Sequence, residues 1–454
     1  MTKTPRWKLH VEGLGKIREA DVEIHPLMLF VGDNDSGKSY LASLLWGLIA
    51  LQGELAPPAG PLLEACEAWF RAKLSAYPDD EGFALTNEDQ ILFVKLFADS
   101  VEANRSRLVQ RVFSSKFPGL SRIVFDAVPA DEVLPRIALR RGESGSAHVA
   151  FVGDGSHGLA SSSLASIAML VATHLALTKF ADSWTHSDMR RPGAPLFLPA
   201  SRTGFMLLYK AAVRRRFRQL EVLDEQELGV KLTLPTSRFI EMLAVGLTDQ
   251  IGPYAEEADF LEEALNGRVE RTAVAGVGVN DYHYRPGKGE VRLDMSLASS
   301  LVTELAPIIL VLRHSQDLPV LILEEPEAHL HPRLQRKLAQ VIVRLIRKGV
   351  YVWITTHSEN FCQQINNFMK IGASEDRAKL RTDLQEKLGY SYGEQDYLTT
   401  DDIAAYEFIN EGDHSVVRQL KKYPDGVVMP SFNKEMVAVT KEVLFLDEQM
   451  SEKE

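Results

Sequence analysis

The feature that most constrains this chain is a glycine-rich turn between a buried strand and a helix. Residues Pro26–Val31 form a continuous apolar run, typical of a strand buried on both faces, and an apolar helix pattern covers Tyr40–Leu51. The turn between them, Gly32-Asp-Asn-Asp-Ser-Gly37-Lys38-Ser39, has the spacing G-x-x-x-x-G-K-[ST]. This order of strand, turn and helix predicts a loop that binds phosphate. The alternative is a tight turn without a ligand.

Phosphate binding needs these residue types at this spacing. Glycines let successive backbone N–H groups turn toward the phosphates, and the N-terminus of the helix adds a partial positive charge. Lys38 would reach the β- and γ-phosphates of ATP, and the Ser39 hydroxyl would bind Mg²⁺. The predicted nucleotide-binding residues are Gly32, Asn34, Asp35, Ser36, Gly37, Lys38, Ser39 and Tyr40.

Two adjacent acids end a second buried strand. Val320–Leu323 is apolar throughout, and Glu324 and Glu325 follow it directly. A carboxylate at the C-terminal end of a parallel strand faces the crevice in which ligands bind. One acid could therefore hold a metal through water while the other addresses an attacking water. The alternative is a pair of solvated acids that simply end the strand.

A histidine follows the next predicted strand, Val350–Thr355. Because it comes after the acidic strand, His357 is expected to sense or polarise the γ-phosphate rather than to make an ordinary loop hydrogen bond. A zinc cluster is a competing interpretation, since His-x-His spacing occurs in zinc sites. Its ligands would come from Glu324, Glu325, Glu327, His329, His331 and His357.

Composition excludes several classes of protein. The 454 residues are 45% apolar and 25% charged, which is ordinary for a globular protein, and two cysteines cannot form a disulfide framework. The chain opens without an apolar signal-peptide core, so a cytoplasmic protein is expected. The longest apolar stretch, Leu164–Leu177, falls short of the ~20 residues of a membrane span. We expect a buried helix there, and no membrane contact.

The net charge of −11 leaves no global basic footprint for nucleic acid. Two local runs contain several cations without an acid. Each is expected to be a solvated helix face or a track for DNA phosphates, and the first is the stronger candidate for DNA. The first run contains Lys210, Arg214, Arg215, Arg216 and Arg218; the second contains Arg333, Arg336, Lys337, Arg344, Arg347 and Lys348.

These pieces occur in an order that resembles a known class of ATPases. A P-loop near residue 32, a serine-rich helix start near 299, two adjacent glutamates and His357 follow each other as in the ATP-binding-cassette (ABC) class. The opening Leu9–Ala20 and the phrase Leu323-Glu-Glu-Pro-Glu-Ala-His-Leu-His-Pro332 resemble the branch that includes RecF, SMC-type and OLD-family ATPases. The resemblance covers about residues 5–50 and 285–365. Stand-alone bacterial members of this kind occur in anti-phage defence operons.

The resemblance implies a role for each matched acid and histidine. Ser39 and Glu324 would hold Mg²⁺. Glu325 would be the general base that orients the attacking water. His357 would contact the γ-phosphate. Lys38 and the neighbouring backbone would hold the phosphates of ATP.

The resemblance also implies a signature motif that serves the ATP of a partner subunit. Ser299 and Ser300 fill its position, although Leu301 stands where a glycine is usual. A plain serine N-cap is the alternative at this helix start. Arg202, within Pro199-Ala-Ser-Arg-Thr-Gly204, is similar to a phrase of such ATPases, and its role stays open between a structural ion pair and a functional one.

The expected fold class is α/β: a P-loop NTPase core with an ABC-ATPase-type mixed or parallel sheet, plus an inserted, mainly helical lobe. We expect a helix over residues 157–180, helices broken at Pro235 and Pro253 over residues 205–270, and a hairpin over residues 277–294. The expected divisions are residues 1–55 and 276–375 for the ATPase core, 56–195 for the inserted lobe with a small β element, 196–275 for a helical segment, and 376–454 for a C-terminal α/β extension.

The expected function is ATP hydrolysis by a dimer or higher oligomer that sandwiches nucleotides between subunits. It would control a separate effector, such as a nuclease encoded nearby, in a DNA-related or anti-phage process. The alternative is a scaffold that ATP assembles and that holds a toxin partner during slow hydrolysis. A transporter subunit is disfavoured because 260 residues separate Ser39 from Ser299 (299 − 39). The signature position and His357 disfavour a P-loop kinase.

Overall fold

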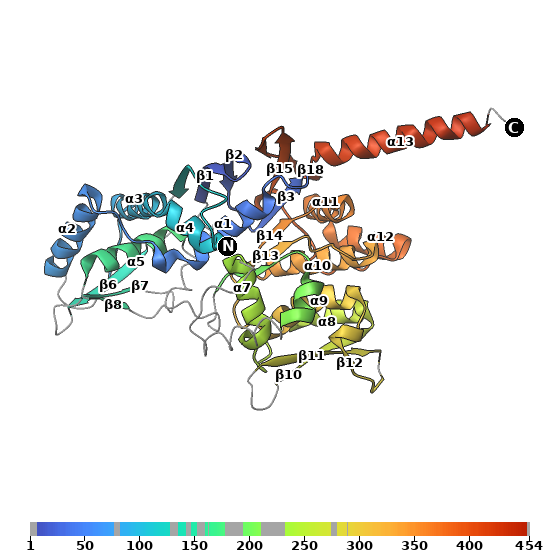
Figure 1. The fold of residues 1–454 in the computed structure, drawn as a ribbon, viewed down its shortest axis with the longest axis horizontal. Coiled ribbons are helices and arrows are strands. Elements are labelled where there is room, and N and C mark those ends of the chain that lie inside the picture. Colours follow the sequence, from blue (N-terminus) through green and yellow to red (C-terminus); the bar gives the residue numbers. More distant parts are fainter. Residues whose placement is uncertain are drawn as a thin grey trace.

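The computed structural model describes residues 7–76, 82–127, 135–141, 147–151, 159–161, 163–177, 194–209, 232–273, 279–287 and 289–451. A nine-stranded sheet forms the centre of the molecule (Figure 1), in the order β5-β1-β2-β16-β15-β3-β14-β13-β9. Its strands are β1 (Trp7–Leu14), β2 (Ile17–Glu23), β3 (Leu27–Gly32), β5 (Arg122–Ala127), β9 (Leu196–Leu198), β13 (Val320–Glu324), β14 (Tyr351–Thr355), β15 (Ile403–Glu411) and β16 (His414–Gln419).

Five neighbouring strands of this sheet run parallel. They are β15, β3, β14, β13 and β9, so their C-terminal ends lie along one edge of the sheet. β16 pairs parallel with β2, whereas β1–β2, β1–β5 and β15–β16 are antiparallel. The prediction of an α/β fold with a mixed, mostly parallel sheet is confirmed.

Strand β3 shows why the chain before the glycine-rich turn is apolar throughout. Met28 and Phe30 belong to the core on one face of the sheet, and Leu27, Leu29 and Val31 belong to the core on the opposite face. Because successive side chains of a strand point to opposite faces, a strand covered on both sides is apolar at every position. The first face is covered by α1 (Lys38–Ala50); the second is covered by α9 (Ser300–His314), α10 (Pro332–Arg347) and α11 (Glu359–Ala373).

The first lobe combines four helices with a four-stranded sheet of order β4-β6-β7-β8 (Figure 1, left). In its helix α3, Thr86 is the N-cap and accepts a hydrogen bond from Asp89 N at 3.2 Å. Strand β5 follows this helical part and pairs with β1, so the inserted residues also widen the central sheet. The lobe contains α2 (Pro61–Ala76), α3 (Asn87–Ala103), α4 (Arg105–Phe113), α5 (Leu164–Leu177), β4 (Phe83–Ala84), β6 (Arg136–Arg141), β7 (Ala147–Phe151) and β8 (Leu159–Ser161).

Helix α5 is the predicted buried helix, and the structure corrects its start. Ile167, Ala168 and Val171 are fully buried against the first lobe's core. The helix expected over residues 157–180 begins only at Leu164, because residues 159–161 pair with β7 as strand β8. Within the described ranges, no helix is both long and apolar enough to cross a membrane.

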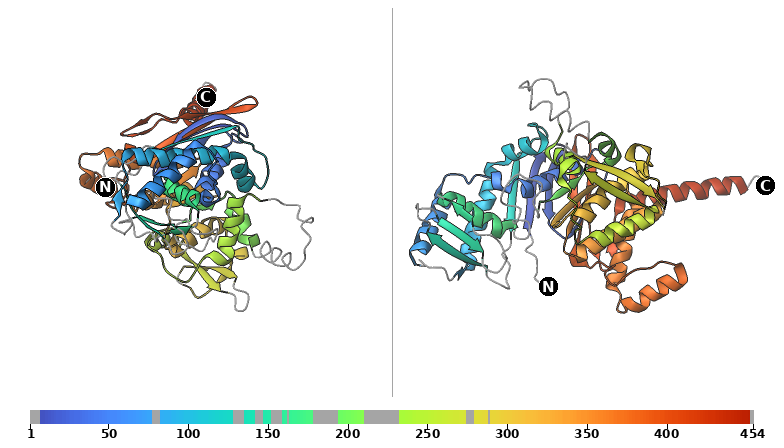
Figure 2. Two further views of the ribbon diagram at one scale, coloured as in Figure 1. Left: turned by 90° about the vertical axis from the view of Figure 1, so that its left-hand side faces the viewer. Right: turned by 90° about the horizontal axis from the view of Figure 1, so that it is seen from below.

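A second lobe lies below the central sheet in the view of Figure 1, whereas the first lobe lies to the left; Figure 2 shows the same molecule from two other directions. The predicted hairpin of residues 277–294 is confirmed as β11–β12. Residues 196–275, expected to be helical, also supply β9 and β10. The helices are interrupted at both predicted prolines: Pro235 lies in the first turn of α7, and Pro253 lies just before the N-cap of α8. The lobe contains α7 (Leu234–Glu241), a π-helical turn (Met242–Gly246), α8 (Ala255–Leu265), β10 (Gly267–Ala273), β11 (Asn280–Pro286) and β12 (Leu293–Asp294).

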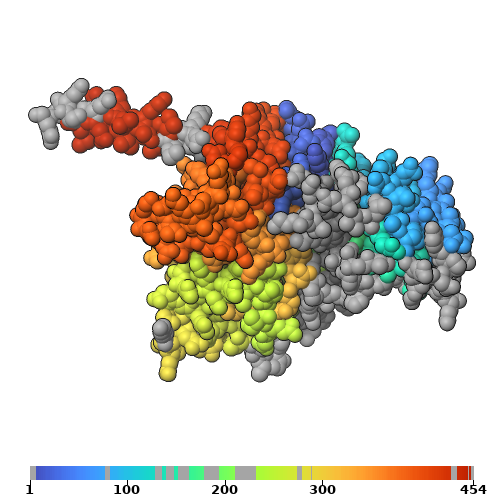
Figure 3. All heavy atoms as spheres, turned by 180° about the vertical axis from the view of Figure 1, so that it is seen from behind, coloured from blue at the N-terminus to red at the C-terminus, as the bar shows by residue number. Residues whose placement is uncertain are grey.

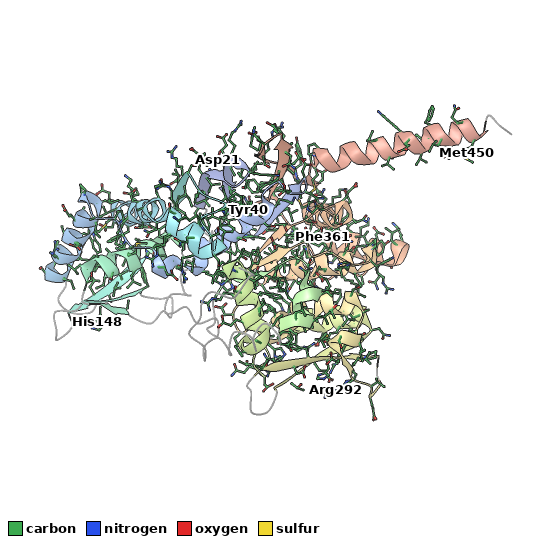
Figure 4. The ribbon with its side chains drawn as sticks, in the orientation of Figure 1. Asp21, Tyr40, His148, Arg292, Phe361 and Met450 are labelled. Atoms are coloured by element: carbon green, nitrogen blue, oxygen red, sulfur yellow. The ribbon has the colours of Figure 1, made fainter. Side chains whose placement is uncertain are left out.

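The C-terminal residues enter the central sheet. Strand β15 lies between β16 and β3, so it pairs directly with the strand that precedes the glycine-rich turn. Residues 376–454, expected as an extension, therefore supply part of the core. Helix α12 (Arg377–Leu388) precedes β15, and a small hairpin of β17 (Lys422–Tyr423) and β18 (Gly426–Val427) follows β16. Helix α13 (Pro430–Ser451) then projects from the body, with Met450 near its end (Figures 3 and 4).

Candidate functional site

The predicted phosphate loop connects β3 to α1, and two of its glycines are required by geometry. Gly32 has φ 118° and Gly37 has φ 94°, in the region that favours glycine. A Cβ atom on Gly32 would lie 2.2 Å from the carbonyl oxygen of Phe408, and one on Gly37 would lie 2.7 Å from Ile17 Cγ1. The loop therefore folds tightly against β15 and β2, and larger residues would displace it.

Strand β15 holds the loop by backbone and side-chain hydrogen bonds. Asp33 N donates to the Phe408 carbonyl at 3.0 Å. Asn410 N donates to Asp33 Oδ2 at 2.9 Å, and Asn410 Nδ2 donates to the Asn34 carbonyl at 3.0 Å. Asn410 was missed by the sequence analysis, because nothing in its surroundings along the chain links it to a loop so far away in sequence.

Lys38 folds back into the loop that it follows. Its ammonium donates to the Gly32 carbonyl at 3.1 Å, to the Asp33 carbonyl and to Ser36 Oγ at 3.3 Å. The residue is only 5% exposed, and burial lowers the pKa of Lys38 to about 8 despite the nearby carboxylates. The ammonium thus lies inside the loop, bonded to oxygens that the oxygens of a phosphate could replace.

Ser39 and Glu324, the two predicted metal ligands, are brought together. Burial raises the pKa of the Glu324 carboxyl, and the nearby Ser39 hydroxyl partly offsets this by lowering it. The Ala200 N–H donates to Glu324 Oε2 at 3.3 Å. Glu324 Oε1 is buried and has no hydrogen-bond partner within the described part of the chain. A hydroxyl and an under-bonded carboxylate are hard oxygen donors, so these two residues fit Mg²⁺.

Glu325 begins the loop after β13 in a strained backbone conformation. Its φ is 43°, in the left-handed region that a residue with a Cβ rarely adopts. Its N–H donates to the Thr355 carbonyl at 2.8 Å, which extends the β13–β14 pairing by one residue. Its side chain is 44% exposed, so the carboxylate is accessible to water above the strand ends.

The His357 side chain lies between Glu325, the predicted base, and the phosphate loop. Its Nε2 lies 3.8 Å from Glu325 Oε1, and the ring is close enough to the Gly32 backbone and to Lys38 for both to affect its pKa. Burial, followed by the positive charge of Lys38, lowers the pKa of His357 below its ordinary value of 6.5. The imidazole is therefore neutral at pH 7.

Glu327 anchors the segment that carries this histidine. Its Oε1 accepts hydrogen bonds from Thr356 Oγ1 at 2.6 Å, His357 N at 2.9 Å and Ser358 N at 3.1 Å. The sequence analysis named Glu327 only as a zinc ligand. Its place within the acid-rich phrase was a signal, but its distance to the histidine segment was not readable from the sequence.

The signature candidates lie on an exposed helix start. Ser299 is the N-cap of α9 and accepts a hydrogen bond from Val302 N at 3.4 Å. Ser299 and Ser300 are both exposed. The structure therefore shows the N-cap that formed the alternative interpretation, and it leaves both serines accessible to a second molecule. Tyr40 packs its ring edge-on against Phe113 and Phe117, so only its backbone remains at the loop.

The competing zinc cluster is not assembled. Among the described residues, the set of three potential ligands whose atoms lie within 4.8 Å of one another is Asp281, His283 and Asp294, in the second lobe. His329 and His331 lie in the turn that leads into α10, and His331 is the N-cap of that helix. Glu324, Glu325, Glu327 and His357 instead make the contacts described above.

The basic runs differ in what the structure says of them. The run with Arg214, Arg215, Arg216 and Arg218 lies outside the described residues. In the second run, Arg344 forms an ion pair with Asp396 at 2.8 Å, and the Arg336 guanidinium lies 3.6 Å from the Tyr390 ring centre. Those cations of α10 bind the α11–β15 connection rather than forming an open phosphate track.

The nine-stranded sheet, the phosphate loop and the carboxylates at the strand ends define a P-loop NTPase fold. A family model described as "AAA domain, putative AbiEii toxin, Type IV TA system" matches residues 210–362, which include α9, β13, α10 and β14. The match covers the predicted signature, acidic and histidine segments, and not the phosphate loop itself. No curated protein matches the chain in sequence.

The chain also resembles solved SMC head domains at low identity. One is an SMC head bound to the C-terminal winged-helix domain of ScpA, with 13% identity, TM-score 0.38 and coverage of 91% of this chain and 97% of that one. Another is the Pyrococcus furiosus SMC head with an extended coiled coil, bound to the C-terminal domain of ScpA, with 11% identity, TM-score 0.38 and coverage of 97% and 100%. A third is the Thermotoga maritima SMC head, with 10% identity, TM-score 0.34 and coverage of 92% and 100%.

Proposed function

We propose that this protein binds and hydrolyses ATP in a dimer or higher oligomer, in which each phosphate loop meets the Ser299–Ser300 helix start of another subunit. The observation that carries the proposal is that residues at the ends of three strands, β3, β13 and β14, lie together. There, Ser39 contacts Glu324 beside the buried Lys38, and Glu325 lies next to His357.

Each side chain of the site has a distinct task. Lys38 and the loop N–H groups would bind the β- and γ-phosphates. Ser39 and Glu324 would hold Mg²⁺, which supplies charge neutralisation at the phosphates. Glu325, accessible to solvent, would accept a proton from the attacking water. The neutral His357 would donate a hydrogen bond to the γ-phosphate while Glu327 keeps its backbone in place.

Hydrolysis would be converted into assembly and release of the oligomer. Ser299 and Ser300 are exposed at a helix N-terminus, where hydroxyls and free N–H groups can bind a partner's γ-phosphate. Nucleotide state would then control a separate effector protein, in a DNA-related or anti-phage defence process. The matched family description applies the words "putative AbiEii toxin, Type IV TA system" to the domain itself, which supports a role of this protein in a toxin–antitoxin system.

A pair of variants tests the proposal. Glu325→Gln keeps the shape of the side chain but removes the base, so ATP and Mg²⁺ should still bind. Hydrolysis should fall by roughly two orders of magnitude or more. The ATP-bound oligomer should then persist in size-exclusion chromatography, while Lys38→Ala should show no ATP-dependent change in size. Parental hydrolysis by Glu325→Gln would refute the catalytic assignment, and a very low rate in the parent would favour the ATP-assembled scaffold.

A further inference from the structure

Arg202 is fully buried, and it contacts the backbone carbonyls of Glu324 and Glu325, the two acids at the end of β13. It stands at the start of the helix that follows β9. Its guanidinium donates to the Glu324 carbonyl at 2.6 Å and to the Glu325 carbonyl at 3.0 Å. A further bond to the Pro199 carbonyl, at 3.1 Å, ties the guanidinium to the segment after β9. One side of Arg202 is thus fixed to the predicted metal ligand and the predicted base.

The other side of Arg202 is fixed to the first turns of α9. Its Nη2 forms an ion pair with Glu304 Oε1 at 2.8 Å, and its Nε donates to the Glu304 carbonyl at 3.2 Å. The neighbouring Thr203 donates from its N–H to Glu304 Oε2 at 2.9 Å, and from its hydroxyl to the Ser300 carbonyl at 3.3 Å. Residues 202 and 203 therefore connect the end of β13 to the helix that begins with the signature serines.

The chemistry of this connection favours arginine over any other residue. A guanidinium presents five N–H donors in a rigid plane, whereas a lysine offers one compact, rotating ammonium. The four hydrogen bonds of Arg202 go to backbone carbonyls on three different segments, so a single ammonium could not replace them together. A buried charge is costly unless it is paired, and Glu304, itself fully buried, provides that pair.

Backbone strain marks the same place. Glu325, whose carbonyl accepts a hydrogen bond from Arg202, has φ 43°, and Ser201, which directly precedes Arg202, has φ 57°, so both are in the left-handed region. Such conformations persist only where surrounding contacts hold them, and they occur preferentially at functional sites. The bond from Arg202 to the Glu325 carbonyl is one of these contacts.

We infer that Arg202 is a positioning residue that links the nucleotide state of its own subunit to the helix start that serves the partner's nucleotide. The inference rests on the proposed function, because it assumes that Ser299 and Ser300 act in trans. A shift of Glu324 or Glu325 on nucleotide binding would move their carbonyls, and the rigid guanidinium would transmit this shift to Glu304. The two sites of an oligomer would thereby be coupled.

A purely structural ion pair is the rival explanation, and α9 contains a matched control. Near the other end of this helix, Arg313 pairs with Glu262 at 2.7 Å and with Asp259 at 3.0 Å. Arg313→Lys makes the same change to an arginine on the same helix that pairs with two acids, without touching the β13 loop. Glu304→Gln is a second variant, which removes the charge on α9 but keeps the bonds from Arg202 to the Glu324 and Glu325 carbonyls.

Amide hydrogen exchange with Mg²⁺·ADP as the probe tests the link directly. ADP has no γ-phosphate for the serines of another subunit, so a response of α9 reports on its own subunit. In the parent and in Arg313→Lys, we expect slower exchange in the phosphate loop and in the first turns of α9. In Arg202→Lys and Glu304→Gln, the phosphate loop should still be protected, whereas the response of α9 should be clearly reduced. Each variant weakens the link to α9, although the bond from Thr203 to the Ser300 carbonyl remains in both and the bond from Arg202 to the Glu304 carbonyl remains in Glu304→Gln.

Steady-state kinetics with ATP give a second readout. Arg202→Lys should lower kcat by roughly tenfold or more, the usual scale for a residue that supports a catalytic group, while KM stays within a few-fold. Glu304→Gln should keep kcat within a few-fold of the parent, because Arg202 still donates to the carbonyls of Glu324 and Glu325 in this variant. Melting temperatures identify any variant that fails to fold. If either Arg202→Lys or Glu304→Gln fails to fold, the other variant is used for the comparison with the parent.

The outcomes distinguish failure of the inference about Arg202 from failure of the proposed function. The inference is refuted if α9 of Arg202→Lys and Glu304→Gln responds to Mg²⁺·ADP as in the parent, or if only the phosphate loop responds in the parent. A parent that shows the linked response but no hydrolysis would refute the catalytic part of the proposed function and keep Arg202 as the link. Failure of Mg²⁺·ADP to protect the phosphate loop would refute both.

Discussion

Glu327 Oε1 accepts a hydrogen bond from the backbone N–H of His357 at 2.9 Å, and the same oxygen accepts from Thr356 Oγ1 and Ser358 N. The carboxylate belongs to the loop after β13, and the three donors belong to the loop after β14. One buried oxygen therefore fixes two strand ends relative to each other, and with them the distance between Glu325 and His357.

Removal of this carboxylate should disturb catalysis more than binding. We expect Glu327→Ala to lower ATP hydrolysis about tenfold or more, because the histidine segment loses its acceptor. Three donors lose a charged acceptor, so the free energy of unfolding should also fall by roughly 1–3 kcal/mol. ATP affinity, which depends on Lys38 and the loop, should change only a few-fold. Kinetics and thermal melts check both effects.

Glu386→Ala on the exposed α12 is the control for this change, since it removes an acid from the surface. Glu327→Gln should give an intermediate rate, because an amide oxygen still accepts hydrogen bonds without the charge. If the rate of Glu327→Ala equals that of Glu386→Ala, His357 is held by other contacts.

The buried Lys38 predicts a pH dependence of nucleotide affinity. Its pKa is about 8 in the free protein, and phosphates would raise it in the complex. Above pH 8 the free protein loses this proton, and binding then requires its uptake. Affinity for Mg²⁺·ATP should thus be flat from pH 7 to 8, and should weaken by up to about tenfold per pH unit above that. Calorimetry in buffers of different ionisation enthalpy would measure the proton uptake.

The same shift has the opposite consequence for the free protein. Between pH 8 and the ordinary lysine value of 10.5, the unfolded chain binds more protons than the folded one, so the stability contributed by this group rises with pH. Lys38→Met should remove both effects, and it should raise the melting temperature at pH 7 by removing a buried charge. A parental pH slope in Lys38→Met would assign the titration to another group.

The sequence predicted the parts of this site that are local along the chain. The strand before Gly32, the turn itself and the helix after Ser39 are fixed by a continuous pattern of apolar residues and glycines. Glu324 and Glu325 were recognisable because they directly follow a buried strand. The contact of Ser39 with Glu324 follows from parallel pairing, since β14 lies between β3 and β13 and all three strands end at the same edge.

Other parts depend on contacts between segments that the sequence does not connect. β15 and β16 are C-terminal strands, yet they insert between β3 and β2. This is possible because β2 pairs with β1 on one edge only and does not pair with β3, so one edge of β2 and one edge of β3 are open to pairing. β10 alternates polar and charged residues with few apolar ones, so its strand character appears only where β11 pairs with it. The buried pair of Arg202 and Glu304 joins residues that no local pattern relates.

Gly32 offers a test of how tightly β15 limits the loop. Gly32→Ala would place a Cβ atom 2.2 Å from the Phe408 carbonyl at a φ of 118°. Backbone cannot yield as a flexible side chain can, so we expect a loss of roughly 1–3 kcal/mol in stability, together with loss of ATP binding. Gly289→Ala, whose Cβ would meet nothing closer than 3.8 Å, is the matched control. Denaturant melts and nucleotide titration of both variants decide the point.

Glu324 should control the response to Mg²⁺. Its Oε1 is buried and has no hydrogen-bond partner among the residues that the structure describes, and Ser39 lies next to the carboxylate. Glu324→Gln keeps the shape but presents a weaker ligand, so the Mg²⁺ concentration for half-maximal hydrolysis should rise by about 10- to 100-fold. Nucleotide binding without metal should be nearly unchanged. If the Mg²⁺ requirement is unaltered, Glu324 is not a metal ligand and Mg²⁺ is bound by other residues.

The arrangement of sites between subunits can be tested by mixing two inactive variants. Lys38→Ala destroys the phosphate loop but leaves the Ser299 helix start intact, whereas Ser299→Arg blocks the helix start and leaves the loop intact. Each variant alone should hydrolyse little ATP. In a mixed pair, the loop of one subunit meets the helix start of the other, so one complete site is restored. At equal amounts, half of the pairs are mixed and each has one intact site of two, which gives roughly a quarter of the parental rate for independent sites.

Addition of Lys38→Ala to Glu325→Gln is the control and should restore nothing, because every pair then lacks either a loop or a base at each site. If the first mixture also restores nothing while both variants fold and exchange subunits, Ser299 does not act on a partner's nucleotide, and the helix start has only its N-cap role.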